Sequence, residues 1–335
     1  MPRVLVVDDS AFARTVLSRV LRASGNIDVV GTARDGDDAL ARIAELDPDV
    51  VTLDLTMPQR DGLGVLRALA GRARPRVVVV SVSTIDSDIG VEALALGAID
   101  LVSKPSALAT DRLYELGDTL VQTVLAAGLP ARVAALPVPV AAAGDRTELV
   151  MIGTSTGGPQ ALTRILAALP EDLSAPVAMV LHIPVGYTEG LARRLDATSP
   201  LRVVEASDGI ELRAGQAVLA RAGMHLRIER RGALFIGHLE AGPFLPHVPA
   251  VDELFRSGAR AAGRSALGIV LTGMGDDGLE GARAIAAEGG QLITESATSC
   301  VVYGMPRCVD EAGIGARSFP LDQIAREIVN HAAPR

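Results

Sequence analysis

The sequence is short of several features that mark particular classes of protein. Its 335 residues include two cysteines, Cys300 and Cys308, whose spacing fits neither a zinc site nor a disulfide framework. No apolar run is long enough to span a bilayer, and the start of the chain lacks the pattern of a signal peptide. A net charge of −8 argues against nucleic-acid binding, which usually needs a basic face. We therefore expect a cytoplasmic protein that neither inserts into membranes nor binds nucleic acid.

Lysine is also nearly missing. Of the 32 lysine and arginine residues, 31 are arginine (32 − 1) and one is Lys104, in the stretch LVSKPS at residues 101–106. An ammonium is a compact point charge on a flexible stem, whereas a guanidinium is planar and prefers a bidentate partner. Lys104 is therefore either a residual surface lysine or the cation of a site in which arginine would not serve.

What the sequence does contain is two series of alternating apolar runs and helical patterns, enough for about two domains. Residues 1–124 hold five βα units, which predict a five-stranded parallel, doubly wound sheet. Residues 125–146 are rich in Ala, Pro and Val and lack a clear period, so we interpret them as a linker. Residues 147–335 form a second doubly wound α/β domain. Paired runs at 217–236 predict a hairpin there. We therefore expect the sheet of this domain to be mixed, with mostly parallel strands and an antiparallel hairpin.

Charged and polar side chains stand at the ends of the predicted strands of the first domain. Asp8 and Asp9 end the first strand, Asp54 the third, Ser81 the fourth and Lys104 the fifth. In an open parallel sheet these ends meet at the ligand-binding edge. Three carboxylates repel one another unless a cation joins them, and hard oxygen ligands suit Mg²⁺. A carboxylate beside Mg²⁺ can attack a phosphoryl donor, and the new charge then needs a compact cation and a hydroxyl donor.

These residues lie in the motifs VVDDS, LDLTMPQRDG, VVVVSVST and LVSKPS, and residues 3–124 resemble the receiver domains of two-component response regulators. The resemblance implies that Asp54 accepts a phosphoryl group from a histidine kinase, and that Ser81 and Lys104 form the switch. It also implies a Mg²⁺ site made by Asp8, Asp9, Asp54 and the carbonyl of Thr56. Leu101 departs from the family, because many receivers carry Phe or Tyr three residues before the lysine.

The second domain opens with MIGTSTGGPQALTRILAALP, which predicts a strand, a glycine-rich turn and a helix. Ser155 stands in the turn, and Pro159 suits the first turn of the helix. A helix N-terminus favours developing negative charge, so this serine could be a nucleophile. It could equally be an N-cap or part of a phosphate-binding loop, although Ser155 stands where the dinucleotide motif needs glycine.

A nucleophilic serine needs a base, and all five histidines lie in the second domain. His182 directly follows the apolar strand APVAMVL, at the carboxyl edge of the predicted sheet. The other four are weaker candidates: His225 and His238 in the hairpin region, His247 in a proline-rich loop and His331 in the tail. Asp276 and Asp277 follow another apolar strand, in ALGIVLTGMG, so either can orient the base. We expect Ser155, His182 and one of these aspartates to meet at one crevice.

Residues 148–331 resemble the chemotaxis protein-glutamate methylesterases, through IGTSTGG, LHIPVGYTEGLARRLD, LTGMGDDGLEGA and CVVYGMP. The resemblance implies Ser155 as the nucleophile, His182 as the base and Asp277 as the orienting acid. It implies an oxyanion hole formed by two backbone N–H groups, those of Thr156 and Met274, and no cofactor in this site. The implied substrates are glutamate methyl esters on the cytoplasmic domains of chemoreceptors, which are hydrolysed to glutamate and methanol. Deamidation of receptor glutamines is implied as a secondary activity.

A receiver followed by such a domain predicts an esterase gated by phosphorylation, in which the unphosphorylated receiver lies across the catalytic crevice as a lid. Three departures from the family motivate an alternative. Thr154 stands where Ala is usual, Val185 where Pro is usual, and ESATSC at residues 295–300 where many members have a Gln-Asp-Glu run. The alternative is a catalytically silent, phosphorylation-dependent docking module descended from the esterase.

Overall fold

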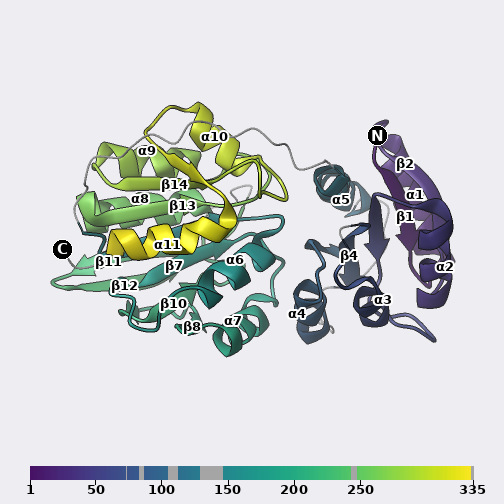
Figure 1. Cartoon of the computed structure of the whole chain (residues 1–335), viewed down its shortest axis with the longest axis horizontal. Coiled ribbons are helices and arrows are strands. Elements are labelled where there is room, and N and C mark those ends of the chain that lie inside the picture. Colours follow the sequence, from purple (N-terminus) through teal and green to yellow (C-terminus); the bar gives the residue numbers. More distant parts are fainter. Residues whose placement is uncertain (73, 83–86, 105–111, 129–145, 243–246, 333–335) are drawn as a thin grey trace. The chain divides into compact units, whose positions relative to one another are not determined.

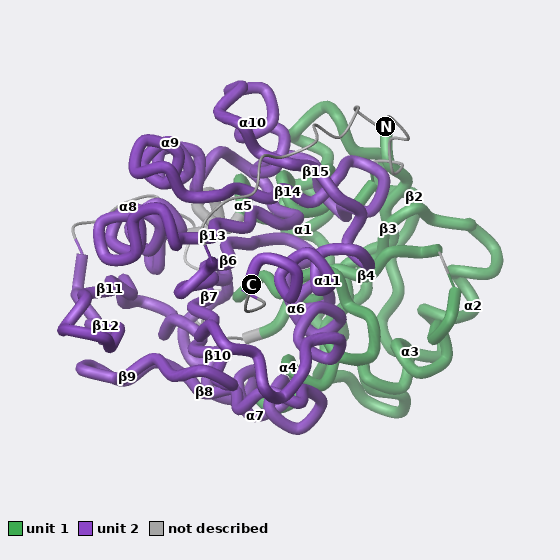
Figure 2. The backbone as a smooth tube through the Cα atoms, turned by 60° about the vertical axis from the view of Figure 1, so that its left-hand side comes forward, with its two compact units in different colours: residues 1–130 green, residues 131–335 purple. Residues whose placement is uncertain are grey.

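The structure is a computed structural model of the whole chain (Figure 1). It describes every residue except 73, 83–86, 105–111, 129–145, 243–246 and 333–335. The chain divides into two compact units, residues 1–130 and 131–335 (Figure 2). Most of the predicted linker falls outside the described residues, whereas residues 125–128 continue helix α5 (Arg112–Gly128). None of the helices in the described ranges is long and apolar enough to cross a membrane.

The first unit holds a five-stranded sheet in the order β2-β1-β3-β4-β5, with all neighbouring strands parallel. Its strands are β1 (Arg3–Val7), β2 (Asp28–Ala33), β3 (Val50–Leu53), β4 (Arg76–Val82) and β5 (Asp100–Lys104). Its helices are α1 (Ala11–Ala23), α2 (Gly36–Leu46), α3 (Gly62–Leu69), α4 (Ser87–Ala95) and α5. The central strand β3 is buried along its whole length, as expected when helices cover both faces of a parallel sheet. The predicted five-stranded parallel sheet is confirmed.

The second unit is built on a seven-stranded sheet in the order β15-β14-β13-β6-β7-β10-β8. Its strands are β6 (Leu149–Thr154), β7 (Val177–Leu181), β8 (Arg202–Glu205), β10 (Gln216–Leu219), β13 (Ala266–Val270), β14 (Gln291–Glu295) and β15 (Arg317–Phe319). The strand order reverses at β6, which has β7 on one side and β13 on the other. The loops that leave the carboxyl ends of these three strands therefore meet at a switch point, where open α/β sheets bind their ligands.

The predicted hairpin is present, but the expectation that it belongs to a mixed sheet is wrong. Strands β11 (His225–Arg231) and β12 (Leu234–Glu240) pair antiparallel and, with β9 (Ile210–Leu212), form a separate three-stranded sheet. The preceding apolar run, β10, pairs in parallel with β7 and β8 instead. The reason is burial: β10 is almost entirely buried, as a parallel strand inside a sheet should be, whereas the end of β11 is exposed.

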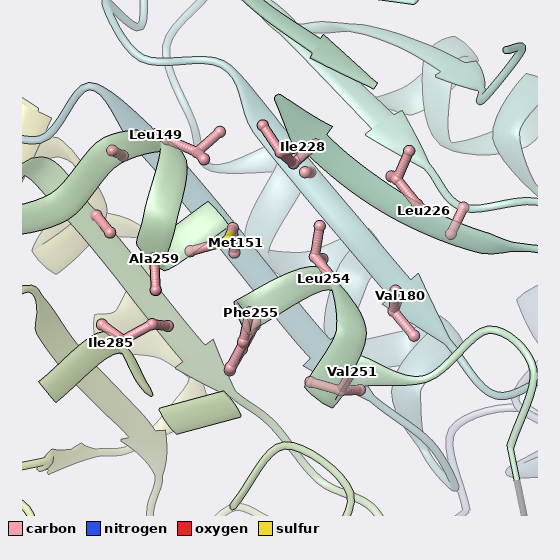
Figure 3. Close-up of a cluster of buried hydrophobic side chains, with 14 of the residues drawn as sticks. Leu149, Met151, Val180, Leu226, Ile228, Val251, Leu254, Phe255, Ala259 and Ile285 are labelled. Carbon is pink, nitrogen blue, oxygen red and sulfur yellow. The ribbon is translucent and has the colours of Figure 1, made fainter. Parts of the chain in front are cut away.

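Helix α8 (Val251–Ala262) links the two sheets of the second unit through one apolar core (Figure 3). Its Leu254 and Phe255 are fully buried in the same cluster as Leu149 and Met151 of β6 and Leu226 of β11. The approach to β6 is close, and two glycines allow it. A Cβ on Gly153 would lie 2.2 Å from Val251, and one on Gly258 would lie 2.1 Å from Met151. The N-terminus of α8 is thus held against the carboxyl end of β6.

The remaining helices of the second unit complete its two outer layers. They are α6 (Gly158–Ala167), α7 (Thr188–Thr198), α9 (Leu279–Ala287), α10 (Met305–Glu311) and α11 (Leu321–Ala332). Helix α9 packs against α8, and α11 packs against α6 (Figure 1). A short 3₁₀ turn, Gly263–Ser265, joins α8 to β13. The two α/β domains that the sequence predicts are both present.

Candidate active site

The sharp turn between β6 and α6 presents Ser155. The serine is half-buried, while Thr154 and Thr156 on either side of it are buried. Gly157 has φ +83°, a backbone conformation that favours glycine, and a Cβ there would lie 2.7 Å from Val301. The turn closes with a hydrogen bond of 2.7 Å from the Gly158 N–H to the Ser155 carbonyl. The serine therefore stands at the edge of the sheet, just before the helix N-terminus.

Strand register puts His182 beside this serine. Thr154 of β6 pairs with Leu181 of β7, so Ser155 and His182 are the next residues on two neighbouring strands. The His182 N–H also donates to the Thr154 carbonyl at 3.1 Å, which extends the ladder by one residue. The nucleophile and base candidates are brought together by parallel pairing rather than by loop packing.

Asp277 completes the group from the loop between β13 and α9. Its Oδ2 lies 2.8 Å from His182 Nε2, and it also accepts hydrogen bonds from the N–H groups of Val251 (2.8 Å) and Asp252 (2.9 Å). Burial alone would raise the pKa of Asp277, but the hydrogen bonds with His182 and these N–H groups outweigh it and lower the pKa. Asp276, the other acid candidate, has an exposed side chain. The structure thus brings Asp277 to the histidine.

The tautomer of His182 follows from this contact. An ionised carboxylate only accepts hydrogen bonds, so Nε2 carries the proton that lies toward Asp277. Nδ1 then carries a lone pair, and among the described residues this buried atom has no hydrogen-bond partner. The arrangement leaves one nitrogen of the ring available to accept a proton.

Thr272, at the end of β13, braces the serine turn from behind. Its carbonyl accepts hydrogen bonds from the Ser155 N–H (3.1 Å) and the Thr154 hydroxyl (2.7 Å). Its own hydroxyl donates to the Thr156 carbonyl at 2.9 Å. Thr154, one of the departures from the family, is therefore a bonded part of the turn. Three consecutive residues of the turn are held by one threonine.

Glu295 in turn holds Thr272. Its carboxylate accepts hydrogen bonds from the Thr272 N–H and the Ser299 hydroxyl, both at 2.9 Å. The side chain is fully buried, and this burial raises the pKa of Glu295 even though its hydrogen bonds and Arg164 oppose the change. A buried carboxylate so close behind a candidate nucleophile was not predicted, because its partner is a backbone N–H from another strand.

The two predicted oxyanion donors come from two different segments near the serine. Thr156 follows Ser155 directly, and Met274 follows Gly273. Because Gly273 has no side chain, its backbone can approach Ser155 closely: a Cβ on Gly273 would lie 2.9 Å from the Ser155 Cβ. Gly273 is held by Gly304, whose N–H donates to its carbonyl at 3.1 Å. The role of both N–H groups remains a prediction.

Histidines other than His182 have different surroundings. His225 is buried and accepts a hydrogen bond from the Ala250 N–H at 3.1 Å, and burial lowers its pKa. His238 lies in the hairpin, within 3.0 Å of Glu229. The ring of His247 is stacked on that of His182, with centroids 4.1 Å apart and planes 11° apart. His247 is a weak candidate for the base by sequence, because it lies in a proline-rich loop, yet its ring lies against that of His182.

A second cluster lies at the carboxyl edge of the sheet in the first unit. Carboxylate oxygens of Asp8, Asp9 and Asp54 all lie within 4.8 Å of one another. Lys104 Nζ lies 2.6 Å from both Asp8 Oδ2 and Asp54 Oδ2. Burial raises the pKa of Asp54 and Asp8 adds to this, whereas Lys104 acts in the opposite direction. Lys104 is 9% exposed, so it is not a residual surface lysine.

The other predicted receiver residues lie in the same unit. The Thr56 N–H donates to Asp54 Oδ1 at 3.4 Å, and Ser81 is a buried residue of β4. Leu101, which stands where many receivers have an aromatic residue, is 6% exposed in β5. The predicted phosphoacceptor, acidic pair and lysine are therefore gathered at one point.

Comparisons with known proteins identify the family of both domains. Residues 150–328 match the family model for the CheB methylesterase, and residues 4–115 match that for the response regulator receiver domain. The Myxococcus xanthus protein-glutamate methylesterase/protein-glutamine glutaminase 5 is 56% identical, over 98% of this chain and 97% of its own length. A Symbiobacterium thermophilum protein-glutamate methylesterase/protein-glutamine glutaminase is 44% identical over 97% of this chain and 96% of its own. The crystal structure of the Thermotoga maritima CheB methylesterase catalytic domain matches with a TM-score of 0.54 and 36% identity, covering 55% of this chain and 98% of that one.

Replacing Glu295 with Gln should make the protein more stable at neutral pH. Because the pKa of Glu295 is raised on folding, the acid loses folding free energy as the pH rises above the ordinary range of glutamate, and an amide does not. We expect equal stability at acidic pH and a higher free energy of unfolding for Glu295→Gln at neutral pH, measured by urea unfolding.

Glu295→Leu is the matched control, because it removes the acceptor as well as the charge. It leaves the Thr272 N–H buried without a partner, which should cost about 1–3 kcal/mol and lower activity. If Glu295→Gln is no more stable than the wild type at neutral pH, the hydrogen bonds of the carboxylate fully offset its burial.

Proposed function

Because the chain belongs to the CheB methylesterase family, we propose that it is a phosphorylation-controlled protein-glutamate methylesterase with glutaminase activity, acting in chemotaxis on chemoreceptors. The observation that carries the proposal is the hydrogen bond between His182 and Asp277, next to Ser155 on the neighbouring strand. Base and orienting acid are already in contact, which is the arrangement that activates a serine.

The proposed reaction uses groups of the chain alone. Ser155 Oγ attacks the ester carbonyl of a receptor glutamate methyl ester, and His182 Nδ1 takes the hydroxyl proton. The N–H groups of Thr156 and Met274 stabilise the oxyanion. His182 returns the proton to the leaving oxygen, methanol departs, and an acyl-enzyme remains. Water then attacks with His182 as base, releasing glutamate and restoring the serine. With a glutamine substrate, ammonia leaves instead.

Asp277 is suited to its part in this cycle. Its two hydrogen bonds from the first N–H groups of α8 hold it in place and favour its ionised form. An ionised Asp277 stabilises the imidazolium that forms when His182 takes the proton, and it keeps the ring in one tautomer.

The alternative of a silent docking module finds no support in the site. Its motivation was the set of departures at Thr154, Val185 and residues 295–300. Thr154 and Glu295 form hydrogen bonds that brace the serine turn, and Val185 is an exposed loop residue. The departures therefore remove none of the three proposed triad residues and do not break the contact between His182 and Asp277.

In the receiver, we propose that Asp54 takes a phosphoryl group from a histidine kinase. The donor set fits Mg²⁺, because three hard carboxylates lie within reach of one ion. Asp8, Asp9, Asp54 and the Thr56 carbonyl would hold the ion. The ion would offset the negative charge of the incoming phosphoryl group. Lys104, now paired with Asp54, would contact the phosphoryl oxygen. The unphosphorylated receiver would restrict access to Ser155, and phosphorylation would relieve that restriction.

Ser155→Ala should abolish methanol release from methylated receptors while the fold remains intact. The expected loss is about 10⁴-fold or more, and His182→Ala should cost a similar amount because the two residues act as a unit. A fluorophosphonate probe should label the wild type at Ser155 and leave Ser155→Ala unlabelled.

Two aspartate variants test the acid. Asp277→Asn should lower the rate of methanol release far more than Asp276→Asn, because Asp277 contacts His182 and Asp276 is exposed.

Absence of fluorophosphonate labelling in the wild type would favour the docking module.

Lys104→Arg tests whether the receiver needs a compact ammonium. The substitution keeps the charge, but a guanidinium does not fit where Nζ lies 2.6 Å from two carboxylates. We expect Asp54 still to take up phosphate from a small-molecule donor in the presence of Mg²⁺, with activation of the esterase largely lost. Phosphate uptake and methanol release should be measured together, with Asp54→Ala as the variant that takes up none. Full activation of Lys104→Arg would show that charge alone suffices.

Removing residues 1 to 140 tests the direction of control. If the receiver restricts access, the remaining domain should have a higher basal rate than the unphosphorylated full chain, measured as methanol release per enzyme. An unchanged rate would leave phosphorylation with a recruiting role.

A further inference from the structure

A second imidazole lies against the base of the proposed triad. The rings of His247 and His182 are nearly parallel, 11° apart, and their centroids are separated by 4.1 Å. That separation is within the range of stacked aromatic rings. One face of His182 is therefore covered by His247, while its edge contacts Asp277.

The residues that follow His247 are anchored at two points. The Val248 carbonyl accepts a hydrogen bond from the Gly223 N–H at 3.0 Å, and the Ala250 N–H donates to buried His225 at 3.1 Å. The next two N–H groups, of Val251 and Asp252, donate to Asp277. Residues 247–252 thus supply both the ring that covers His182 and the donors that hold its carboxylate partner.

The charges around His247 favour a neutral ring. His247 is an exposed residue, but its ring lies against His182, and the desolvation of that ring lowers the pKa of His247; a positive His182 lowers it further, whereas Asp277 and Asp276 act in the opposite direction. Two imidazolium rings stacked at this distance would repel each other. The face of a neutral His247 ring is also a favourable neighbour for a cation.

We propose that His247 is a positioning residue for His182: its ring covers one face of the base, fixes the plane of that ring in line with Asp277 and keeps water from it. His247 does not itself accept the serine proton. The inference rests on the proposed function for the role of His182 as base, and on the stack for the role of His247.

Three variants in the full chain test the proposal. His247→Ala removes the ring, His247→Phe keeps a ring without nitrogens, and His238→Ala removes a hairpin histidine that contacts Glu229 instead. We expect His247→Ala to lower kcat by about 10- to 100-fold with little change in KM, since a misplaced base costs rate more than binding. His247→Phe should recover most of the rate, and His238→Ala should match the wild type.

Two kinetic results would overturn the proposal. If His247→Phe is as slow as His247→Ala, the nitrogens of His247 take part and the ring alone is not what matters. If His247→Ala keeps the wild-type kcat, the stack has no role. An inactive wild type would instead contradict the proposed function.

The stack can also be tested without turnover. In the wild type and in His247→Phe, the ring protons of His182 should show upfield NMR shifts from the ring current of the stacked neighbour. In His247→Ala these resonances should move downfield. Identical His182 resonances in the wild type and His247→Ala would mean that the rings do not stack in solution, and would overturn the proposal even if the enzyme is active.

Discussion

The catalytic unit depends on the carboxylate of Asp277 at the N-terminus of α8. One side chain joins three segments that are far apart in the sequence: the loop after β13, the start of α8 and His182 after β7. A reciprocal contact runs from α8 to the start of α9. Asp252, in the first turn of α8, accepts hydrogen bonds from the N–H groups of Gly278 and Gly281. Each helix start is thus satisfied by a carboxylate from the other segment.

The serine turn depends on a different kind of support. Asp277 holds the base through its contact with His182, whereas Thr272 and the fully buried Glu295 hold the turn. Because Glu295 is fully buried, these hydrogen bonds face no competition from water, but the same burial opposes its charge. Precise placement of the serine is therefore obtained at some expense of stability at neutral pH.

The two units treat buried carboxylates in opposite ways. In the esterase unit, backbone N–H groups and a histidine keep Asp277 ionised, and its pKa is lowered. In the receiver, Asp54 shares its site with Asp8 and Lys104, and its pKa is raised. A permanent acceptor suits the partner of a base. A carboxylate paired with a flexible lysine would suit the proposed phosphoacceptor, because the lysine can follow the new charge.

The sequence by itself determined the class of both domains and most of the residues at their edges. Parallel strands bring their carboxyl ends together, so residues that follow apolar runs, such as Asp54, Ser155 and His182, could be placed from pattern alone. Placing these residues at the sheet edge requires only the strand order and direction, and not the packing of side chains. The choice of Asp277 over Asp276 came from resemblance, and only the contact with His182 gives its physical reason.

Only the tertiary structure decided the rest. The hairpin lies outside the main sheet because β10 took the place beside β7, and that pairing joins strands that are not neighbours in the sequence. His247 came to lie on His182, and Glu295 behind Thr272, through the packing of segments that are remote along the chain. Such contacts depend on where α8 and β14 settle against β6 and β13. That position is set by the fit of many buried side chains, including the close approach at Gly153, and no single motif encodes it.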